Sequence, residues 1–109
     1  MIFGDGKQTR DFVHVSDVVN AIMLALGNDK TRGIYNIGSG IATSINELAR
    51  LILEIMGKED LRPLHAPSRP GDIKHSIADI TRAMRELRFK PGIKLEDGLR
   101  NLVSVYSAR

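Results

Sequence analysis

The 109-residue sequence predicts a small α/β unit built from short strands and about four helices. Helical spacing of apolar residues alternates along the chain with short runs of β-branched and aromatic residues. The sequence contains no cysteine, no internal repeat and no low-complexity stretch. With 42% hydrophobic and 27% charged residues, the composition is that of an ordinary globular protein. Residues 1–109 are therefore expected to form a single unit.

An extended N-terminal segment and a first helix are expected. Residues 11–15 are predicted to be extended and to pair with residues 2–3 across a glycine-rich turn. Ser16 or Asp17 is then placed to cap a helix that continues to about Leu26. Apolar residues at helical spacing give this helix one hydrophobic face.

The middle of the chain predicts a strand, a helix and a further strand. Residues 33–38 have the composition of a short strand. Ser44 and Glu47 match a capping box, and the helix that they open is expected to stop at Gly57. Residues 61–65 are the next candidate strand. These short strands resemble the edges of a sheet whose other strands are absent.

A loop and two helices are predicted for the C-terminal third. Two prolines and a glycine break any regular element within residues 66–76. Asp79 is placed to cap a short helix. Its inward-facing residues are expected to be Ile80, Ala83, Met84 and Leu87. The apolar stripe of a final helix consists of Leu95, Leu99, Leu102, Val103 and Tyr106.

Two arginines are candidates for binding an anion. Arg10 opens an extended segment and is followed by Asp11, whereas Arg69 lies in the loop three residues before Asp72. The planar guanidinium can hold a phosphate by two bonds, and a carboxylate can accept from ribose hydroxyls. Such a set can bind a nucleoside diphosphate. The same residues also fit surface arginines paired with carboxylates, so both readings stay open at this point.

Neither glycine-rich turn matches a dinucleotide-binding loop. The segments Gly38-Ser39-Gly40 and Gly4-Asp5-Gly6 each lack the third glycine, since Thr43 and Thr9 occupy that position. We therefore expect turns that need a permissive backbone. The three histidines show no spacing typical of metal ligands, so no metal site is expected.

The charge distribution argues against nucleic acid as a partner. With 16 basic and 13 acidic residues, the net charge is only +3. The basic residues Arg82, Arg85, Arg88, Lys90 and Lys94 are expected to form a solvated surface, and only Phe89 among them can stack on a base. Apolar runs are far shorter than the roughly 20 residues of a membrane span. A cytoplasmic location without membrane contact is the expectation.

Four stretches in this order resemble a known family. They are Gly-Asp-Gly-Lys-Gln-Thr-Arg-Asp-Phe-Val-His-Val (4–15), Tyr-Asn-Ile-Gly-Ser-Gly (35–40), Arg-Pro-Gly-Asp (69–72) and Leu-Glu-Asp-Gly-Leu (95–99). Together they resemble the C-terminal portion of the NAD-dependent epimerase/dehydratase family, the extended short-chain dehydrogenases that act on nucleotide sugars. UDP-glucose 4-epimerases are the most similar branch.

The resemblance implies a fold and a site. The fold is the C-terminal, substrate-binding part of an extended Rossmann-type enzyme. In that family the arginines at the positions of Arg10 and Arg69 contact the nucleotide diphosphate, and the aspartate at Asp72 contacts the ribose. Gln8 lines the same pocket. The implied function is the nucleotide-sugar-binding portion, with a UDP-sugar as ligand, of an NAD-dependent epimerase.

The family's cofactor loop and catalytic pair have no match in this chain. No Gly-x-x-Gly-x-x-Gly follows a first strand, and Tyr35 has Ser39 where the Tyr-x-x-x-Lys pair needs lysine. We therefore expect no catalytic residue and no bound NAD on this chain, with the N-terminal NAD-binding domain absent. The chain is expected to be a truncated reading frame, part of a split gene or a deliberately shortened piece.

Other interpretations of the function of this chain are consistent with its sequence. The chain can be a stand-alone nucleotide-binding module or one that complements a separate NAD-binding chain, or it can self-associate through an exposed apolar face. A basic nucleic-acid-binding domain is the least favoured. Residues 69–73, Arg-Pro-Gly-Asp-Ile, favour an epimerase over a dehydratase or decarboxylase, because the dehydratase loop tends to carry a histidine before the aspartate. The sugar, the base and the oligomeric state are not fixed by the sequence.

Overall fold

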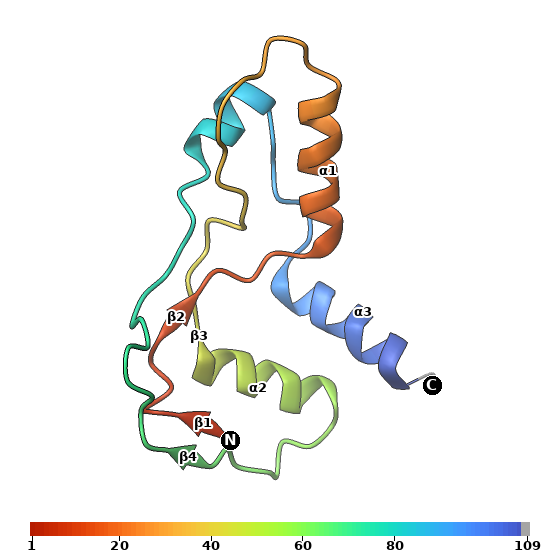
Figure 1. Cartoon of the computed structure of the whole chain (residues 1–109). Helices are drawn as coiled ribbons and strands as arrows, with labels where there is room; N and C mark the ends of the chain where they lie inside the picture. The colour runs from red at the N-terminus through yellow and green to blue at the C-terminus, as the bar shows by residue number, and fades with distance from the viewer. Residues whose placement is uncertain (108–109) are drawn as a thin grey trace.

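The computed structural model describes residues 1–107 and has four helices and four short strands within them (Figure 1). In chain order they are β1 (Ile2–Phe3), β2 (Thr9–Arg10), α1 (Val15–Leu26), β3 (Thr43–Ser44), α2 (Ile45–Ile55), β4 (His65–Ala66), the π-helix η1 (Ala83–Leu87) and α3 (Leu95–Ser107). This architecture confirms the predicted small α/β unit. No helix within residues 1–107 is long and apolar enough to cross a membrane.

The strands form two small ladders, and both join segments distant in sequence. β1 pairs in parallel with β4, and β2 pairs antiparallel with β3. The predicted pairing of residues 2–3 with residues 11–15 is wrong. The reason is that the amides of Ile2 and Gly4 donate to carbonyls of residues 64 and 66, at 2.6 and 2.7 Å.

Two other strand predictions are corrected. Residues 33–38 form no strand, because nothing in the described part of the chain pairs with their backbone in a ladder. A run of strand-forming residues becomes a strand only when a partner satisfies its amides and carbonyls. The strand expected at residues 61–65 is instead the two-residue β4 at His65–Ala66.

Helix α1 begins earlier than the sequence predicts. His14, not Ser16 or Asp17, is its N-cap, and the His14 Nδ1 accepts a hydrogen bond from the Ser16 amide at 3.0 Å. Because His14 caps α1, the Asp17 side chain forms other contacts. Its buried carboxylate accepts from the amides of residues 92 and 93, at 3.0 and 3.1 Å, and ties α1 to the turn before α3.

Helix α2 confirms the predicted cap and end. The Ser44 hydroxyl accepts from the Glu47 amide at 3.1 Å. The reciprocal half of the capping box is missing, since the Glu47 carboxylate accepts from Arg50 instead. Gly57 follows the helix with φ of +69°, a left-handed conformation that glycine adopts without steric cost.

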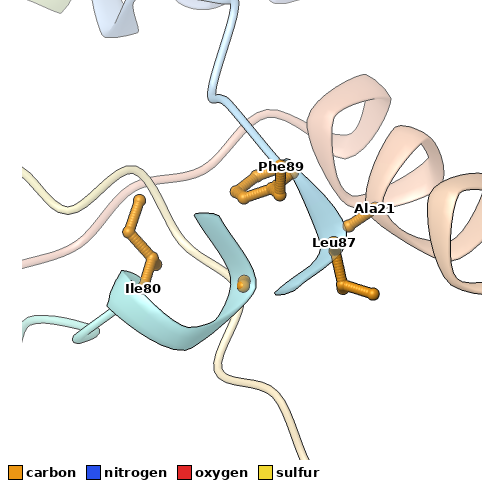
Figure 2. Packing of buried hydrophobic residues seen from close by; sticks show 5 residues of the cluster. Ala21, Ile80, Leu87 and Phe89 are labelled. Carbon is orange, nitrogen blue, oxygen red and sulfur yellow. The ribbon is translucent and has the colours of Figure 1, made fainter. Parts of the chain in front are cut away.

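The small core forms around the short helix η1 and the residues on either side of it (Figure 2). Its buried cluster consists of Ala21, Ile80, Ala83, Leu87 and Phe89. Met84, expected to face inward, is half-exposed. The wider winding of a π-helix changes the angular spacing of its side chains, so Met84 leaves the face shared by Ala83 and Leu87. The predicted cap at Asp79 is wrong, because the N-cap of η1 is Arg82 and no side chain caps it. Asp79 instead accepts from the Thr81 amide at 3.0 Å.

The molecule is flat and open. Its extents are 51 × 37 × 19 Å and its radius of gyration is 16.5 Å, whereas a compact domain of about 100 residues has about 13 Å. Figure 1 shows β1 and β4 at one end, α1 at the other, and α2 and α3 between them. Helix α1 exposes half or more of five large apolar side chains, which we call the α1 patch: Val15, Val19, Ile22, Met23 and Leu26.

Candidate functional site

Strand β2 places Arg10 opposite Asp72. The Arg10 Nη2 donates to Asp72 Oδ1 at 3.0 Å, and its Nη1 donates to the Thr9 carbonyl at 2.8 Å. Less than a third of either side chain is exposed. The structure therefore joins two of the four predicted binding residues, although 62 positions separate them in the sequence.

Arg69 and Gln8 meet at Phe3. The Arg69 guanidinium carbon lies 4.4 Å from the centroid of the Phe3 ring, which is the geometry of a cation–π contact. The Gln8 Nε2 donates to the Phe3 carbonyl at 3.0 Å. Within residues 1–107, Arg69 has no ion pair with a carboxylate, so both edges of its guanidinium fork are open to a ligand.

Three of the four predicted residues, Gln8, Arg69 and Asp72, line one shallow cavity of about 200 Å³. Its lining residues are Phe3, Gly4, Asp5, Gln8, Ser68, Arg69, Asp72, Ile73 and Lys74. Arg10 lines a neighbouring cavity of about 480 Å³ instead, together with residues 35–38 and 76–79. The Arg10–Asp72 ion pair thus joins the rims of the two cavities.

Sequence reasoning missed part of this lining. Lys74 pairs with Asp5, with Nζ at 2.8 and 3.1 Å from the two carboxylate oxygens. The hydrogen bond from Lys74, with that from the Lys7 amide, holds the pKa of Asp5 below its usual value. Lys74 lies two residues after Asp72 in the same loop, a signal that was available in the sequence. No local signal places Phe3 under Arg69, because that contact depends on the pairing of β1 with β4.

Asp11 does not pair with Arg10, although the two are adjacent in sequence. It accepts four hydrogen bonds from distant groups: the amide and hydroxyl of Ser39 at 2.7 Å each, the Gly40 amide at 2.9 Å and the Ala78 amide at 3.2 Å. Partial burial acts to raise the pKa of Asp11. The hydrogen bonds from Ser39, Gly40 and Ala78 outweigh it and hold the pKa below its usual value.

The amides of the 38–40 turn are therefore engaged by a carboxylate. In a dinucleotide-binding loop, such amides face the pyrophosphate. Here the Ser39 and Gly40 amides face Asp11, whose negative charge repels an anion.

The histidines are used in structural contacts. His75 Nδ1 lies 2.8 Å from the Thr9 hydroxyl, and His65 Nδ1 donates to the Gly4 carbonyl at 2.8 Å. His14 caps α1. Among residues 1–107, no group of three or more histidine, aspartate or glutamate side chains is arranged to hold a metal ion.

Comparison with known proteins gives consistent matches over nearly the whole chain. A family model described as GDP-mannose 4,6 dehydratase matches residues 1–102. A UDP-glucose 4-epimerase of Mycolicibacterium smegmatis is 39% identical over 105 residues, which cover 96% of this chain and 33% of that protein. The chain thus spans about one third of the length of the curated relatives that it matches.

Two solved structures show the same arrangement of elements. The UDP-glucose 4-epimerase of Thermotoga maritima, solved with UDP-glucose, is 41% identical with a TM-score of 0.87, over 98% of this chain and 34% of that one. The UDP-glucose 4-epimerase of Thermus thermophilus, solved with NAD, is 31% identical with a TM-score of 0.82, over 97% of this chain and 34% of that one. These values are high enough for homology as well as a shared fold.

Proposed function

The chain belongs to the family of NAD-dependent nucleotide-sugar epimerases and dehydratases, and we propose that it is the C-terminal, nucleotide-sugar-binding part of such an enzyme. One observation carries the proposal. Arg10, Arg69 and Asp72, brought together from two distant segments, stand around adjoining cavities. Arginine forks and a carboxylate at a concave site match a nucleoside diphosphate with its ribose.

We assign the roles from charge and access. Both edges of the Arg69 guanidinium are open, and one of its faces stacks on the Phe3 ring. Arg69 is therefore suited to bind two oxygens of a phosphate. Arg10 offers the second fork once its contact with Asp72 is exchanged for the ligand. Asp72 then accepts from a ribose hydroxyl, and Gln8, held at the Phe3 carbonyl, borders the same space.

We propose a UDP-sugar as the ligand and an epimerase as the parent enzyme. The Thermotoga maritima relative is an epimerase that was solved with UDP-glucose. The loop reads Arg-Pro-Gly-Asp-Ile at residues 69–73, without a histidine before the aspartate.

The residues of this chain do not fit NAD. Neither glycine-rich turn has the third glycine of a dinucleotide loop, and the amides of Ser39 and Gly40 are engaged by Asp11. We therefore assign no NAD contact and no hydride-transfer step to this chain. The proposed role is binding, with the chain catalytically incomplete on its own.

We propose that the α1 patch packs against the NAD-binding part of the enzyme. The five side chains of the patch follow positions i, i+4, i+7, i+8 and i+11, so they share one face of the helix. Each is 52 to 74% exposed, and monomeric proteins rarely leave such a continuous apolar surface uncovered. Without that partner, the same face favours self-association.

A calorimetric titration of the chain tests the proposal. UDP is the ligand, NAD is the control ligand, and Arg10→Lys is the variant. We expect UDP to bind and NAD not to bind. We expect Arg10→Lys to bind UDP roughly tenfold more weakly, because an ammonium is a point charge and does not reproduce the two-bond fork.

Two other outcomes discriminate between the readings. If Arg10→Lys binds UDP with the same affinity as the wild type, Arg10 is only a surface charge and its proposed role in binding the diphosphate is rejected. If the folded chain binds neither ligand, the proposed function fails for this chain on its own. A chain that binds UDP and remains monomeric at high concentration supports the second candidate, a stand-alone nucleotide-binding module.

A further inference from the structure

One carboxylate joins the two segments that flank Arg10. Asp11 Oδ1 accepts from the amide and hydroxyl of Ser39, and its Oδ2 accepts from the amides of Gly40 and Ala78. Ser39 and Gly40 precede β3, whereas Ala78 follows the loop that carries Asp72. The donors thus come from both sides of the chain that continues from β2.

The same two segments pair with β2 itself. On one side, Arg10 faces Thr43 in the antiparallel ladder. On the other side, the Thr9 amide donates to the Lys74 carbonyl at 2.8 Å, and the Ser76 amide donates to the Thr9 carbonyl at 3.1 Å. Asp72 lies two residues before Lys74, so its position depends on this second pairing.

Gly38 and Ala78 pack closely against one side of Asp11. A Cβ atom at Gly38 would lie 2.7 Å from Asp11 Oδ2 and 2.8 Å from the Ala78 side chain. No side chain larger than that of glycine fits there without a shift of Asp11 or Ala78. The carboxylate is therefore fixed in place. Because it accepts from amides distant in sequence, it does not pair with Arg10, and Arg10 pairs with Asp72 instead.

We propose that Asp11 is a positioning residue for the nucleotide-diphosphate site. By fastening the 39–40 turn and residue 78 to the end of β2, it holds Arg10 and the Asp72 loop at the separation that the ligand needs. The proposal rests on the proposed function for its ligand. It assigns Asp11 no contact with that ligand, only an action through Arg10 and Asp72.

Asp11→Asn is the test variant, and Asp17→Asn is its matched control. Both change a carboxylate that accepts from backbone amides into an amide of equal size. Asp17 holds the turn at residues 92–93, which is not part of either cavity near Arg10. We expect both variants to have a lower melting temperature. Only Asp11→Asn is expected to bind UDP roughly tenfold more weakly, as a misplaced fork loses one of its two bonds.

A double-mutant cycle separates positioning from general loss of structure. In an Arg10→Ala background, Asp11→Asn is expected to weaken UDP binding less than it does in the wild type, because one of the two groups through which it acts is gone. Additive losses would show that Asp11 acts only on overall stability, and would overturn the proposal. If Asp11→Asn does not fold, Ser39→Ala removes a single donor and is expected to weaken UDP binding in the same direction.

Amide hydrogen exchange tests the proposal without a ligand. Asp11→Asn is expected to speed exchange at the amides of Thr9 and Ser76, which lie in the pairing beside Arg10, whereas Asp17→Asn leaves them unchanged. Unchanged exchange in Asp11→Asn overturns the positioning role. If the wild-type chain binds no UDP, the proposed function fails on that result, and the exchange measurement still decides the role of Asp11.

Discussion

Arg10 and Asp72 form an ion pair across 62 residues of sequence, with 3.0 Å between Nη2 and Oδ1. One arm of the Arg10 fork therefore contacts a carboxylate. A diphosphate that binds Arg10 must replace this contact, and Asp72 is then released toward the ribose.

The first prediction follows from this exchange. Asp72→Asn is expected to bind inorganic pyrophosphate about two- to fivefold more tightly, because a partly exposed ion pair of about 0.2–1 kcal/mol no longer competes for Arg10. The same variant is expected to bind UDP about tenfold more weakly, because the ribose loses a charged acceptor. Calorimetry with both ligands measures the two changes. Equal weakening of both ligands would contradict the exchange.

Arg69→Ala tests the role proposed for Arg69 in binding the diphosphate. The loss of a charge-assisted hydrogen-bonding pair is expected to cost about 1.5–3 kcal/mol of UDP binding free energy. Because Arg69 rests on an aromatic ring in a loop and has no ion pair within residues 1–107, its removal is expected to change the melting temperature little. Arg100→Ala, on the exposed face of α3, is the control and should leave UDP affinity unchanged. Unchanged affinity in Arg69→Ala would reject its role.

The depressed pKa of Asp11 predicts an acid-sensitive fold. A carboxyl whose pKa is lower in the folded than in the unfolded chain adds stability that is complete above its ordinary value of 3.8. That stability is lost as the pH falls through the folded pKa. Urea unfolding of wild type from about pH 6 to about pH 2.5 should show the decline below about pH 4. In Asp11→Asn the decline should be shallower, and an identical pH profile would contradict the argument.

Arg88 offers a test of backbone strain. It is the single non-glycine residue with a positive φ, 56°, among residues 1–107, and it turns the chain so that Phe89 enters the core. A left-handed conformation costs an L-residue about 1 kcal/mol or more, and glycine adopts it freely. Arg88→Gly is expected to raise the free energy of unfolding by about 0.5 kcal/mol, after the greater entropy of the unfolded chain is allowed for.

Arg85→Gly is the matched control for this substitution. Arg85 is exposed within η1, where glycine has no left-handed turn to relieve. There it is expected to lower the free energy of unfolding by about 1 kcal/mol. Denaturant titration measures both variants. The strain argument fails if both glycine variants are equally destabilised.

The α1 patch predicts concentration-dependent association. Met23 belongs to the patch and is 61% exposed. Met23→Lys is expected to reduce self-association in sedimentation velocity experiments, because a charged side chain opposes burial of that face. UDP affinity should not change, because α1 contributes no residue to the cavity that Arg69 lines. Association that persists at the wild-type level would assign it to another surface.

Local signals in the sequence predict both ends of α2. Ser44 and Gly57 mark the two ends of α2 because caps act within one turn of backbone. The cap of α1 was misassigned, since His14 accepts from a backbone amide as an aspartate or serine would. Among the site residues, Arg10 and Arg69 were identified by their chemistry and by resemblance, and their roles stay predictions.

The tertiary structure alone decided which segments meet. The sequence of residues 33–38 has strand propensity, but a strand needs a partner, and residues 1–107 supply none. Asp11 follows Arg10 directly in the sequence, but the two side chains have different partners in the fold. Asp11 accepts hydrogen bonds from Ser39, Gly40 and Ala78. Arg10 forms an ion pair with Asp72. Helix caps depend on neighbours three or four positions away. Ladders and ion pairs depend on contacts across tens of residues, which become favourable only when the chain folds as a whole.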